Sequence, residues 1–134
     1  NFSRGKFINI RCPNLFGSRG SVLDIWRRQI KKKNFIEVTD PKMTRFFITI
    51  SDAAKFIIDI SLKEDLNSSE IYYPLKFTKK FHLGDLAKAF IKVYGNKETK
   101  IKIVGAKSGE KIHEDYLSDV PFLTVNELIS YLAS

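Results

Sequence analysis

The chain has few of the residues on which several common protein classes depend. It contains one cysteine, Cys12, which excludes an intramolecular disulfide and is typical of a reducing cytoplasm. Its two histidines, His82 and His113, are far apart, and neither has partners at the spacing of a metal site. No apolar run approaches the roughly 20 residues that span a bilayer. The sequence therefore predicts a cytoplasmic protein with no disulfide, no bound metal and no membrane span.

Familiar catalytic motifs are also missing. There is no Gly-x-Ser-x-Gly nucleophile elbow and no phosphate-binding Gly-x-x-x-x-Gly-Lys loop. The stretch Gly17-Ser18-Arg19-Gly20 lacks a third glycine and is typical of an ordinary loop. No residue of this chain is therefore predicted to be catalytic.

The composition favours one small α/β domain. The 134 residues are 43% hydrophobic and include eleven phenylalanines, enough for a single core. The formal net charge is +8, with basic groups at Arg27–Lys33 and Lys79–Lys80. A solvated helix face is the favoured interpretation of the first group, and a nucleic-acid groove is the alternative.

The expected strands are short. Lys6–Cys12 is mostly apolar and β-branched, which predicts a strand covered on both faces, with Cys12 as an inert buried thiol. Pro74 marks one later strand as an edge strand or an irregular one, and a turn at Asp40-Pro41 joins two others. These later strands are Phe35–Val38, Arg45–Ile50, Ile71–Phe77 and Lys100–Val104.

Four helices are expected between and after these strands. The first opens at Ser21, with Asp24 three residues on, and ends at Lys33 and Asn34. The last is a short helix with Thr124 as its cap and Glu127 at the third position. The other two cover residues 52–63, capped by Ser51 or Asp52, and residues 83–94, where the amphipathic pattern is clearest.

Cationic side chains next to turns are the most suggestive chemical feature. Arg45 opens a strand, and a guanidinium there can grip phosphate because its planar fork matches phosphate oxygens and keeps its charge. Arg19, Lys107 and Lys111 also lie near turns. Convergence of these groups on one cleft would suit a diphosphate. Because arginines near turns are common on surfaces, the residues alone leave both interpretations open.

Residues 11–24, 36–54 and 109–114 contain three specific motifs. These are Ser18-Arg19-Gly20-Ser21, Met43-Thr44-Arg45-Phe46-Phe47, and Gly109-Glu110-Lys111 with His113-Glu114. In these motifs the chain resembles the polysaccharide-biosynthesis branch of the extended short-chain dehydrogenase/reductase superfamily, the UDP-N-acetylglucosamine 4,6-dehydratases. The resemblance covers about residues 6–118.

The resemblance implies a fold and a set of binding residues. The fold would be the α/β C-terminal, substrate-binding part of an extended Rossmann-type enzyme, with short strands and amphipathic helices. Residues 1–134 would be one such segment, cut from a longer protein and lacking the N-terminal dinucleotide-binding half. Asn14 would contact the sugar diphosphate, Arg45 would bind the diphosphate, and Arg19 would lie beside the substrate. Glu110 would meet the ribose hydroxyls. Lys107 stands where the family usually has arginine, and it keeps the charge without the fork.

The implied activity is dehydration of a UDP-linked N-acetylhexosamine in the synthesis of surface polysaccharide or glycan. NAD or NADP, bound mainly by the missing half, would oxidise C4 of the hexose, water would leave from C6, and hydride would return there. The family's Tyr-x-x-x-Lys pair is absent, since Tyr72 and Lys76 have the spacing but Pro74 interrupts them. The segment alone is therefore predicted inactive.

The expected partners are a UDP-sugar, the dinucleotide-binding half and further copies in a homo-oligomer, with no nucleic acid. Two alternatives remain: a related nucleotide-sugar epimerase or reductase, and a non-catalytic, basic nucleic-acid-binding module.

Overall fold

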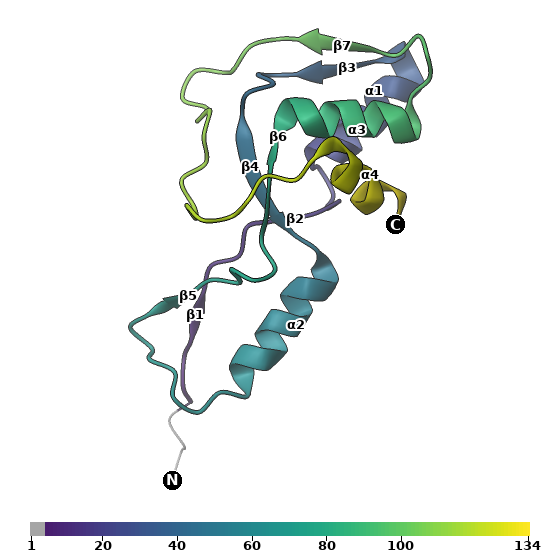
Figure 1. Cartoon of the computed structure of the whole chain (residues 1–134). Helices are drawn as coiled ribbons and strands as arrows, with labels where there is room; N and C mark the ends of the chain where they lie inside the picture. Colours follow the sequence, from purple (N-terminus) through teal and green to yellow (C-terminus); the bar gives the residue numbers. More distant parts are fainter. Residues whose placement is uncertain (1–4) are drawn as a thin grey trace.

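The computed structural model describes residues 5–134, which form an upper body and a lower arm (Figure 1). The arm consists of β1 (Asn9–Ile10), α2 (Ile50–Ser61) and β5 (Ile71–Tyr72). The body contains three helices, α1 (Val22–Lys33), α3 (Leu83–Tyr94) and α4 (Val125–Ala133). Its strands are β2 (Asn14–Leu15), β3 (Phe35–Val38), β4 (Thr44–Ile48), β6 (Lys79–His82) and β7 (Lys100–Ile103).

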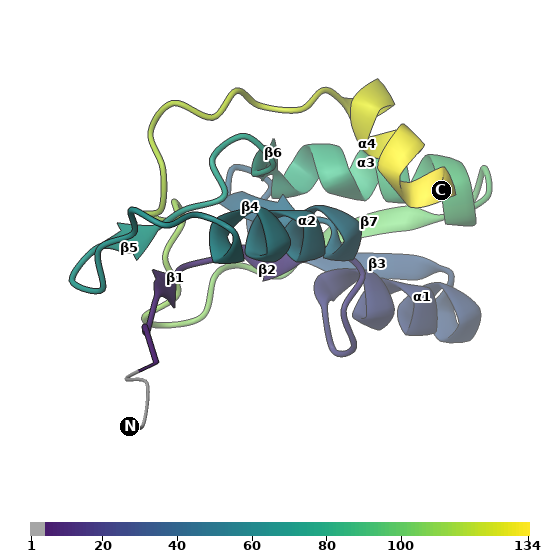
Figure 2. The ribbon, with the colours of Figure 1, turned by 90° about the horizontal axis from the view of Figure 1, so that it is seen from below.

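The body has three layers. The central layer holds a sheet of order β2-β4-β6 and the parallel pair β3-β7. Helix α1 covers one side of these strands, and α3 and α4 cover the other, as Figure 2 shows from below. Trp26 of α1 and Phe90 of α3 are fully buried with ring centroids 5.4 Å apart, and Leu128 of α4 is buried with them. Each such side chain contributes roughly 1.5–3 kcal/mol through burial.

Several predicted elements are confirmed to within a residue or two. Helix α1 ends at Lys33 because Asn34 adopts a left-handed backbone with φ of 49°, a common helix stop. Helix α3 covers residues 83–94 and stops at Gly95. Helix α4 has the predicted capping box, in which the side chains of Thr124 and Glu127 satisfy each other's backbone N–H groups. In each of these helices, the residues that determine where the helix begins or ends are next to that end in the sequence.

Other boundaries differ from the prediction. Helix α2 is capped by Thr49, not by Ser51 or Asp52, because the Thr49 hydroxyl accepts the Asp52 N–H at 3.1 Å. The predicted strand Ile71–Phe77 stops at Tyr72, since Pro74 begins a turn in which its carbonyl accepts the Phe77 N–H at 3.0 Å.

One strand was not predicted at all. The sequence Lys-Lys-Phe-His of β6 has no clear alternation, yet β6 pairs antiparallel with β4 over four residues. A two-residue strand, β2, likewise forms where the sequence predicted none.

The prediction for Lys6–Cys12 is wrong within the described residues. Only Asn9–Ile10 form a strand, which pairs with β5 alone, and the stretch is largely exposed rather than covered on both faces. Phe7 is 83% exposed, and Cys12 is exposed rather than buried. An apolar β-branched run predicts a strand, but it does not say which other segment covers it.

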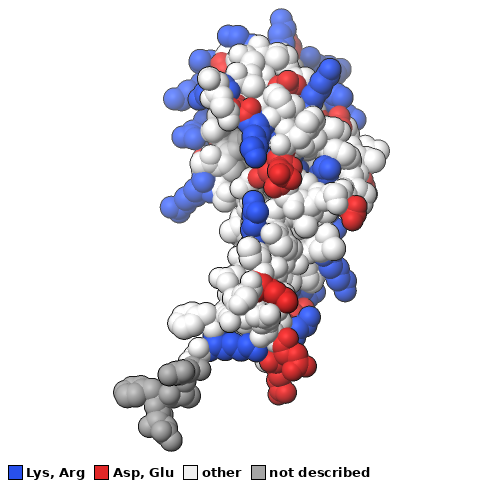
Figure 3. All heavy atoms as spheres, turned by 90° about the vertical axis from the view of Figure 1, so that its left-hand side faces the viewer, with Lys and Arg blue, Asp and Glu red and all other residues white. Residues whose placement is uncertain are grey.

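Helix α2 is the most exposed helix of the arm and body. Apolar side chains at helical spacing, including Ile50, Ile57 and Ile58, are at least half exposed, and only Ala53 and Ile60 are buried. On the face seen in Figure 3, lysines and arginines are prominent over the body, whereas the middle of the arm is largely uncharged. Among the described residues, no helix is long and apolar enough to cross a membrane.

Candidate functional site

A cleft of about 600 Å³ opens in the body, and all five predicted site residues line it. Asn14 and Arg19 come from β2 and the loop after it, Arg45 from β4, and Lys107 and Glu110 from the turn after β7. Asn14 and Arg45 therefore lie on the same side of the domain, and Lys107 lines the same cleft. Lys111, the other candidate lysine, is exposed and outside the cleft lining.

Strand β4 is bonded to two of the segments that contribute residues to this cleft. On one stretch it pairs in parallel with β2, which places Asn14 opposite Phe47. Nearer its start, it bonds to the segment 105–114, here called the strap, through a parallel bridge between Thr44 and His113. The carboxylate of Glu114 accepts the Phe46 N–H at 3.2 Å, at the point between these two partners. Segments about 100 residues apart are thereby fixed to one strand.

Arg45 is firmly positioned at the start of β4. Its Nη1 donates to the carbonyls of Thr44 at 2.9 Å and Ile112 at 3.1 Å, and its Nη2 lies 3.4 Å from the Met43 sulfur. Nη2 also lies 3.7 Å from Oε1 of Glu110. The guanidinium is thus held by backbone groups on one side while its side chain remains 22% exposed. A charge fixed in this way needs little reorganisation to meet an anionic ligand.

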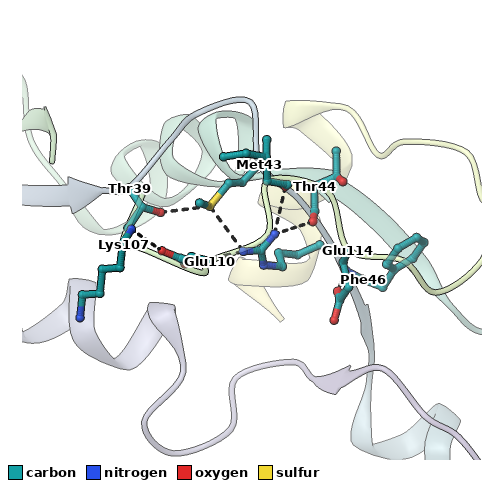
Figure 4. Close-up of polar contacts among 9 residues, drawn as sticks. Thr39, Met43, Thr44, Phe46, Lys107, Glu110 and Glu114 are labelled. Atoms are coloured by element: carbon teal, nitrogen blue, oxygen red, sulfur yellow. Dashed lines mark hydrogen bonds and ion pairs between the residues drawn. The ribbon is translucent and has the colours of Figure 1, made fainter. Parts of the chain in front are cut away.

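The turn Lys107–Glu110 contributes its first and last residues to the lining of the cleft. The Glu110 N–H donates to the Lys107 carbonyl at 3.0 Å, and Gly109 has φ of 83°, the conformation that a type II turn requires at its third position. In return, Oε2 of Glu110 accepts the Lys107 N–H at 3.2 Å. Figure 4 shows Glu110 reaching back to Lys107, and Thr39 directed at the Met43 sulfur.

The N-terminus of α1 faces the same cleft. Gly20, the N-cap Ser21 and Val22 all line it, and the Ser21 hydroxyl is buried without a hydrogen-bond partner among the described residues. Ser21 is the predicted start of this helix, but Asp24 accepts the Gly20 N–H at 3.2 Å rather than completing a capping box. A helix N-terminus carries partial positive charge and free N–H groups, which favours an anion.

Sequence reasoning missed several lining residues. Trp26, Met43 and Glu37 contribute to the cleft, and Trp26 is anchored by donation from its indole N–H to the Glu37 carbonyl at 2.7 Å. Met43 had a signal, since it directly precedes Thr44 and Arg45 in the motif. Trp26 and Glu37 had none, because their place in the wall depends on α1 packing against β3.

Metal chemistry has no support from residues 5–134, in which no three His, Cys, Asp or Glu side chains cluster as metal ligands. His113 instead meets the Thr44 hydroxyl at 3.1 Å, and His82 stacks on Phe122 with centroids 4.0 Å apart. Although Cys12 is exposed, partial desolvation by its neighbours raises the pKa of its thiol, which disfavours the nucleophilic thiolate.

Comparison with solved structures defines the class of protein. The chain superposes on the X-ray structure of Pen from Bacillus thuringiensis with a TM-score of 0.80 and 25% identity, covering 96% of this chain and 49% of that one. It also matches UDP-glucuronic acid 4-epimerase from Bacillus cereus, solved with UDP-glucuronic acid and NAD, with a TM-score of 0.66 and 14% identity. That match covers 96% of this chain and 39% of the epimerase. The predicted α/β fold of an extended short-chain dehydrogenase/reductase is confirmed.

Residues 1–131 match the model of the polysaccharide biosynthesis protein family, and the chain belongs to that family. It is 36% identical over 118 residues to the probable polysaccharide biosynthesis protein EpsC of Bacillus subtilis, covering 87% of this chain and 19% of EpsC. It is 33% identical over 124 residues to a UDP-N-acetylglucosamine 4,6-dehydratase (inverting) of Campylobacter jejuni, covering 92% of this chain and 34% of the dehydratase. The chain thus spans well under half the length of these relatives.

Proposed function

We propose that this chain is the substrate-binding portion of an NAD(P)-dependent UDP-N-acetylhexosamine 4,6-dehydratase that serves polysaccharide synthesis. The observation that carries the proposal is the convergence of Asn14, Arg19, Arg45, Lys107 and Glu110 on one cleft. The family and the dehydratase relative support the same activity. In this scheme the cleft holds the UDP group, and the binding energy of that group orients the hexose for reaction.

The geometry suggests a role for each element of the cleft. Arg45 and the N-terminus of α1 bind the diphosphate, because the first offers a fixed guanidinium and the second offers backbone N–H groups. Asn14 adds a hydrogen bond to the sugar diphosphate, and Arg19 lies beside it. Lys107 supplies a further positive charge, and the Glu110 carboxylate accepts hydrogen bonds from the ribose.

No described residue is assigned to the dinucleotide or to the chemistry at C4. NAD or NADP would supply hydride transfer, but the turn between β2 and α1 has only Gly17 and Gly20 and lacks the third glycine of the dinucleotide-binding fingerprint. We place the cofactor on a dinucleotide-binding half outside residues 1–134 and the enzyme in the cytoplasm. It follows that the 134-residue chain alone does not convert UDP-N-acetylglucosamine to a keto-sugar, even with added NADP. Formation of that product by the chain would contradict this assignment.

A UDP-sugar 4-epimerase is the second candidate, because one of the structural neighbours is such an enzyme. Both activities begin with oxidation at C4 and need the same UDP site, so the cleft does not separate them. The product does: dehydration gives a 4-keto-6-deoxy sugar, whereas epimerisation returns an isomer of the substrate. Product analysis of an enzyme that contains this chain together with a dinucleotide-binding half distinguishes the two.

Binding of UDP to the chain is the direct test of the site. The single tryptophan, Trp26, lies in the cleft wall, so its fluorescence reports on occupancy. We expect UDP to bind more tightly than UMP, and UMP more tightly than uridine. Substitution Arg45→Lys keeps the charge but loses the fork, and we expect it to weaken UDP binding about tenfold, the worth of one charge-assisted hydrogen bond.

Arg28→Lys is the matched control, because Arg28 is 63% exposed and pairs with Asp24 outside the cleft lining. It should leave UDP affinity unchanged. Equal affinities for UDP and uridine, or equal losses in the two variants, would contradict a diphosphate site at Arg45. Retention on heparin that falls with salt but does not respond to UDP would instead favour the nucleic-acid-binding alternative.

A further inference from the structure

The Glu110 carboxylate contacts the donor groups of the cleft that are best able to bind an anion. Its Oε1 lies 3.7 Å from Nη2 of Arg45, and its Oε2 accepts the backbone N–H of Lys107 at 3.2 Å. Both oxygens are therefore directed at positive or donor groups, while the side chain is still 32% exposed. The carboxylate stands at the place that a small anion bound to Arg45 would take.

The position of the Glu110 carboxylate is decisive because most N–H donors of Arg45 already have partners. The guanidinium has five N–H groups, and its Nη1 is committed to the carbonyls of Thr44 and Ile112. Nη2 is shared between the Met43 sulfur and Glu110. A phosphate that approaches Nη2 must therefore come close to the Glu110 carboxylate, and like charges at such a distance repel.

The charged residues that line the cleft also single out Glu110. Three cationic residues, Arg19, Arg45 and Lys107, line it, against two anionic residues, Glu37 and Glu110. The Glu37 carboxylate is occupied, since it accepts the Gln29 side-chain amide at 3.0 Å. Glu110 is thus the anionic group that lies against the guanidinium of Arg45.

We propose that Glu110 determines specificity by rejecting ligands that offer only phosphate. A ligand with neighbouring hydroxyl groups donates hydrogen bonds to the carboxylate and so compensates for the repulsion that its phosphates meet. A bare pyrophosphate cannot compensate in this way. The cleft therefore selects ribonucleoside diphosphates over inorganic anions. The nucleoside part of this inference rests on the proposed function, whereas the rejection of inorganic anions rests on the contact between Glu110 and Arg45.

The test compares two ligands on matched variants of the 134-residue chain. UDP and inorganic pyrophosphate are titrated calorimetrically into the native chain, Glu110→Gln and Glu98→Gln. Glutamine keeps an oxygen acceptor for the Lys107 N–H but removes the charge. Glu98 is exposed and outside the cleft lining, so its variant has the same net charge as Glu110→Gln without a change in the site. We expect Glu110→Gln to bind pyrophosphate roughly tenfold more tightly and UDP roughly tenfold more weakly, while Glu98→Gln matches the native chain.

A third variant, Glu110→Asp, keeps the charge and should still reject pyrophosphate, even if the turn adjusts. If Glu110→Gln weakens both ligands, or leaves pyrophosphate binding unchanged, Glu110 only supports the turn and the inference is overturned. If pyrophosphate binding tightens but UDP does not bind to the native chain, the anion rejection holds and the proposed UDP site fails. The two claims are therefore tested separately.

Discussion

Helices α2 and α3 have the same length of 12 residues and are both rich in apolar side chains, but they have opposite surroundings. Helix α3 buries five residues, among them Leu86 and Phe90, between the sheet and α4. Helix α2 buries two and leaves Ile50, Ile57 and Ile58 at least half exposed. Apolar spacing predicts that a helix forms, but it does not predict what covers the helix.

The same contrast separates the body from the arm. The buried core cluster is drawn from α1, the body strands, α3 and α4, and it contains no residue of β1, α2 or β5. The cleft is lined by body elements and the segments attached to them. The body thus carries the positioned side chains, whereas the arm presents apolar surface, a feature typical of an interface with another polypeptide. Four predictions test this division, from the largest expected effect to the smallest.

Leucine-to-alanine changes in the two regions should differ most. Leu86 is 1% exposed in α3, and Leu62, at the end of α2, is 77% exposed. We expect Leu86→Ala to lower the free energy of unfolding by about 2–5 kcal/mol, because it leaves a cavity in the core. Leu62→Ala should change it by less than about 0.5 kcal/mol. Urea denaturation measures both, and equal costs would mean that the arm is covered in solution.

The second prediction is that the chain associates with itself through the arm, which would form the expected homo-oligomer. Light scattering of the native chain should show a mass that rises with concentration, because exposed apolar side chains on α2 lower their free energy by burial. Ile58→Lys should reduce this association. Ile103→Lys is the control, since Ile103 of β7 is 55% exposed and Ile58 is 58% exposed. A native chain that stays monomeric at all concentrations would refute association through the arm.

Loss of a helix cap should also cost more in the body than in the arm. Thr124 caps α4 and Thr49 caps α2, and each hydroxyl accepts a backbone N–H. Thr124→Ala should lower the free energy of unfolding by about 1 kcal/mol, since α4 carries buried residues of the core. Thr49→Ala should cost less than half of that, because α2 can fray while the body stays folded. Thermal unfolding of the two variants decides between this order and its reverse.

The fourth prediction concerns Tyr116, which lies between the body and the arm and whose contribution to stability depends on pH. Tyr116 packs on Phe46 of β4 and on Tyr73 beside β5, and its hydroxyl donates to the Arg11 carbonyl at 2.6 Å. Burial raises the pKa of Tyr116 from 10.0 to about 12, although a hydrogen bond with Thr78 lowers it in part. A raised pKa stabilises the folded chain fully below pH 10.0, and this contribution is lost as the pH rises towards about 12.

Ultraviolet titration of the phenols should show this late step as one tyrosine that ionises near pH 12. The variant Tyr116→Phe should lack the step, and its stability should no longer fall between pH 10.0 and about 12 for this reason. Persistence of the late step in Tyr116→Phe would assign it to another residue.

Local signals explain which parts of the fold could be predicted. The end of α1 at Asn34, the start and end of α3 and the capping box of α4 each depend on neighbouring residues, and all were predicted. The strand β6 was missed because its four residues, Lys79–His82, have no strand pattern of their own and form a strand by pairing with β4. Cys12 was predicted to be buried and is exposed, because its burial depends on a covering segment that the described residues do not provide.

The candidate site could be predicted only with the help of the resemblance. Cationic residues near turns gave no reason of their own to converge, yet Arg19, Arg45 and Lys107 line one cleft. What the resemblance did not predict is how Arg45 is held, since its partners include the Ile112 carbonyl and the Glu110 carboxylate from the strap.

By itself, the sequence determined the local conformations and the family of this protein. Gly109 permits the left-handed turn next to Glu110, and Thr124 with Glu127 starts α4, because each signal acts within a few covalently linked residues. Only the tertiary structure decided that Arg45 faces Glu110 across a cleft and that α2 remains uncovered while α3 is buried. Such outcomes depend on contacts between segments far apart in the chain, where the alternatives differ in packing and not in local preference.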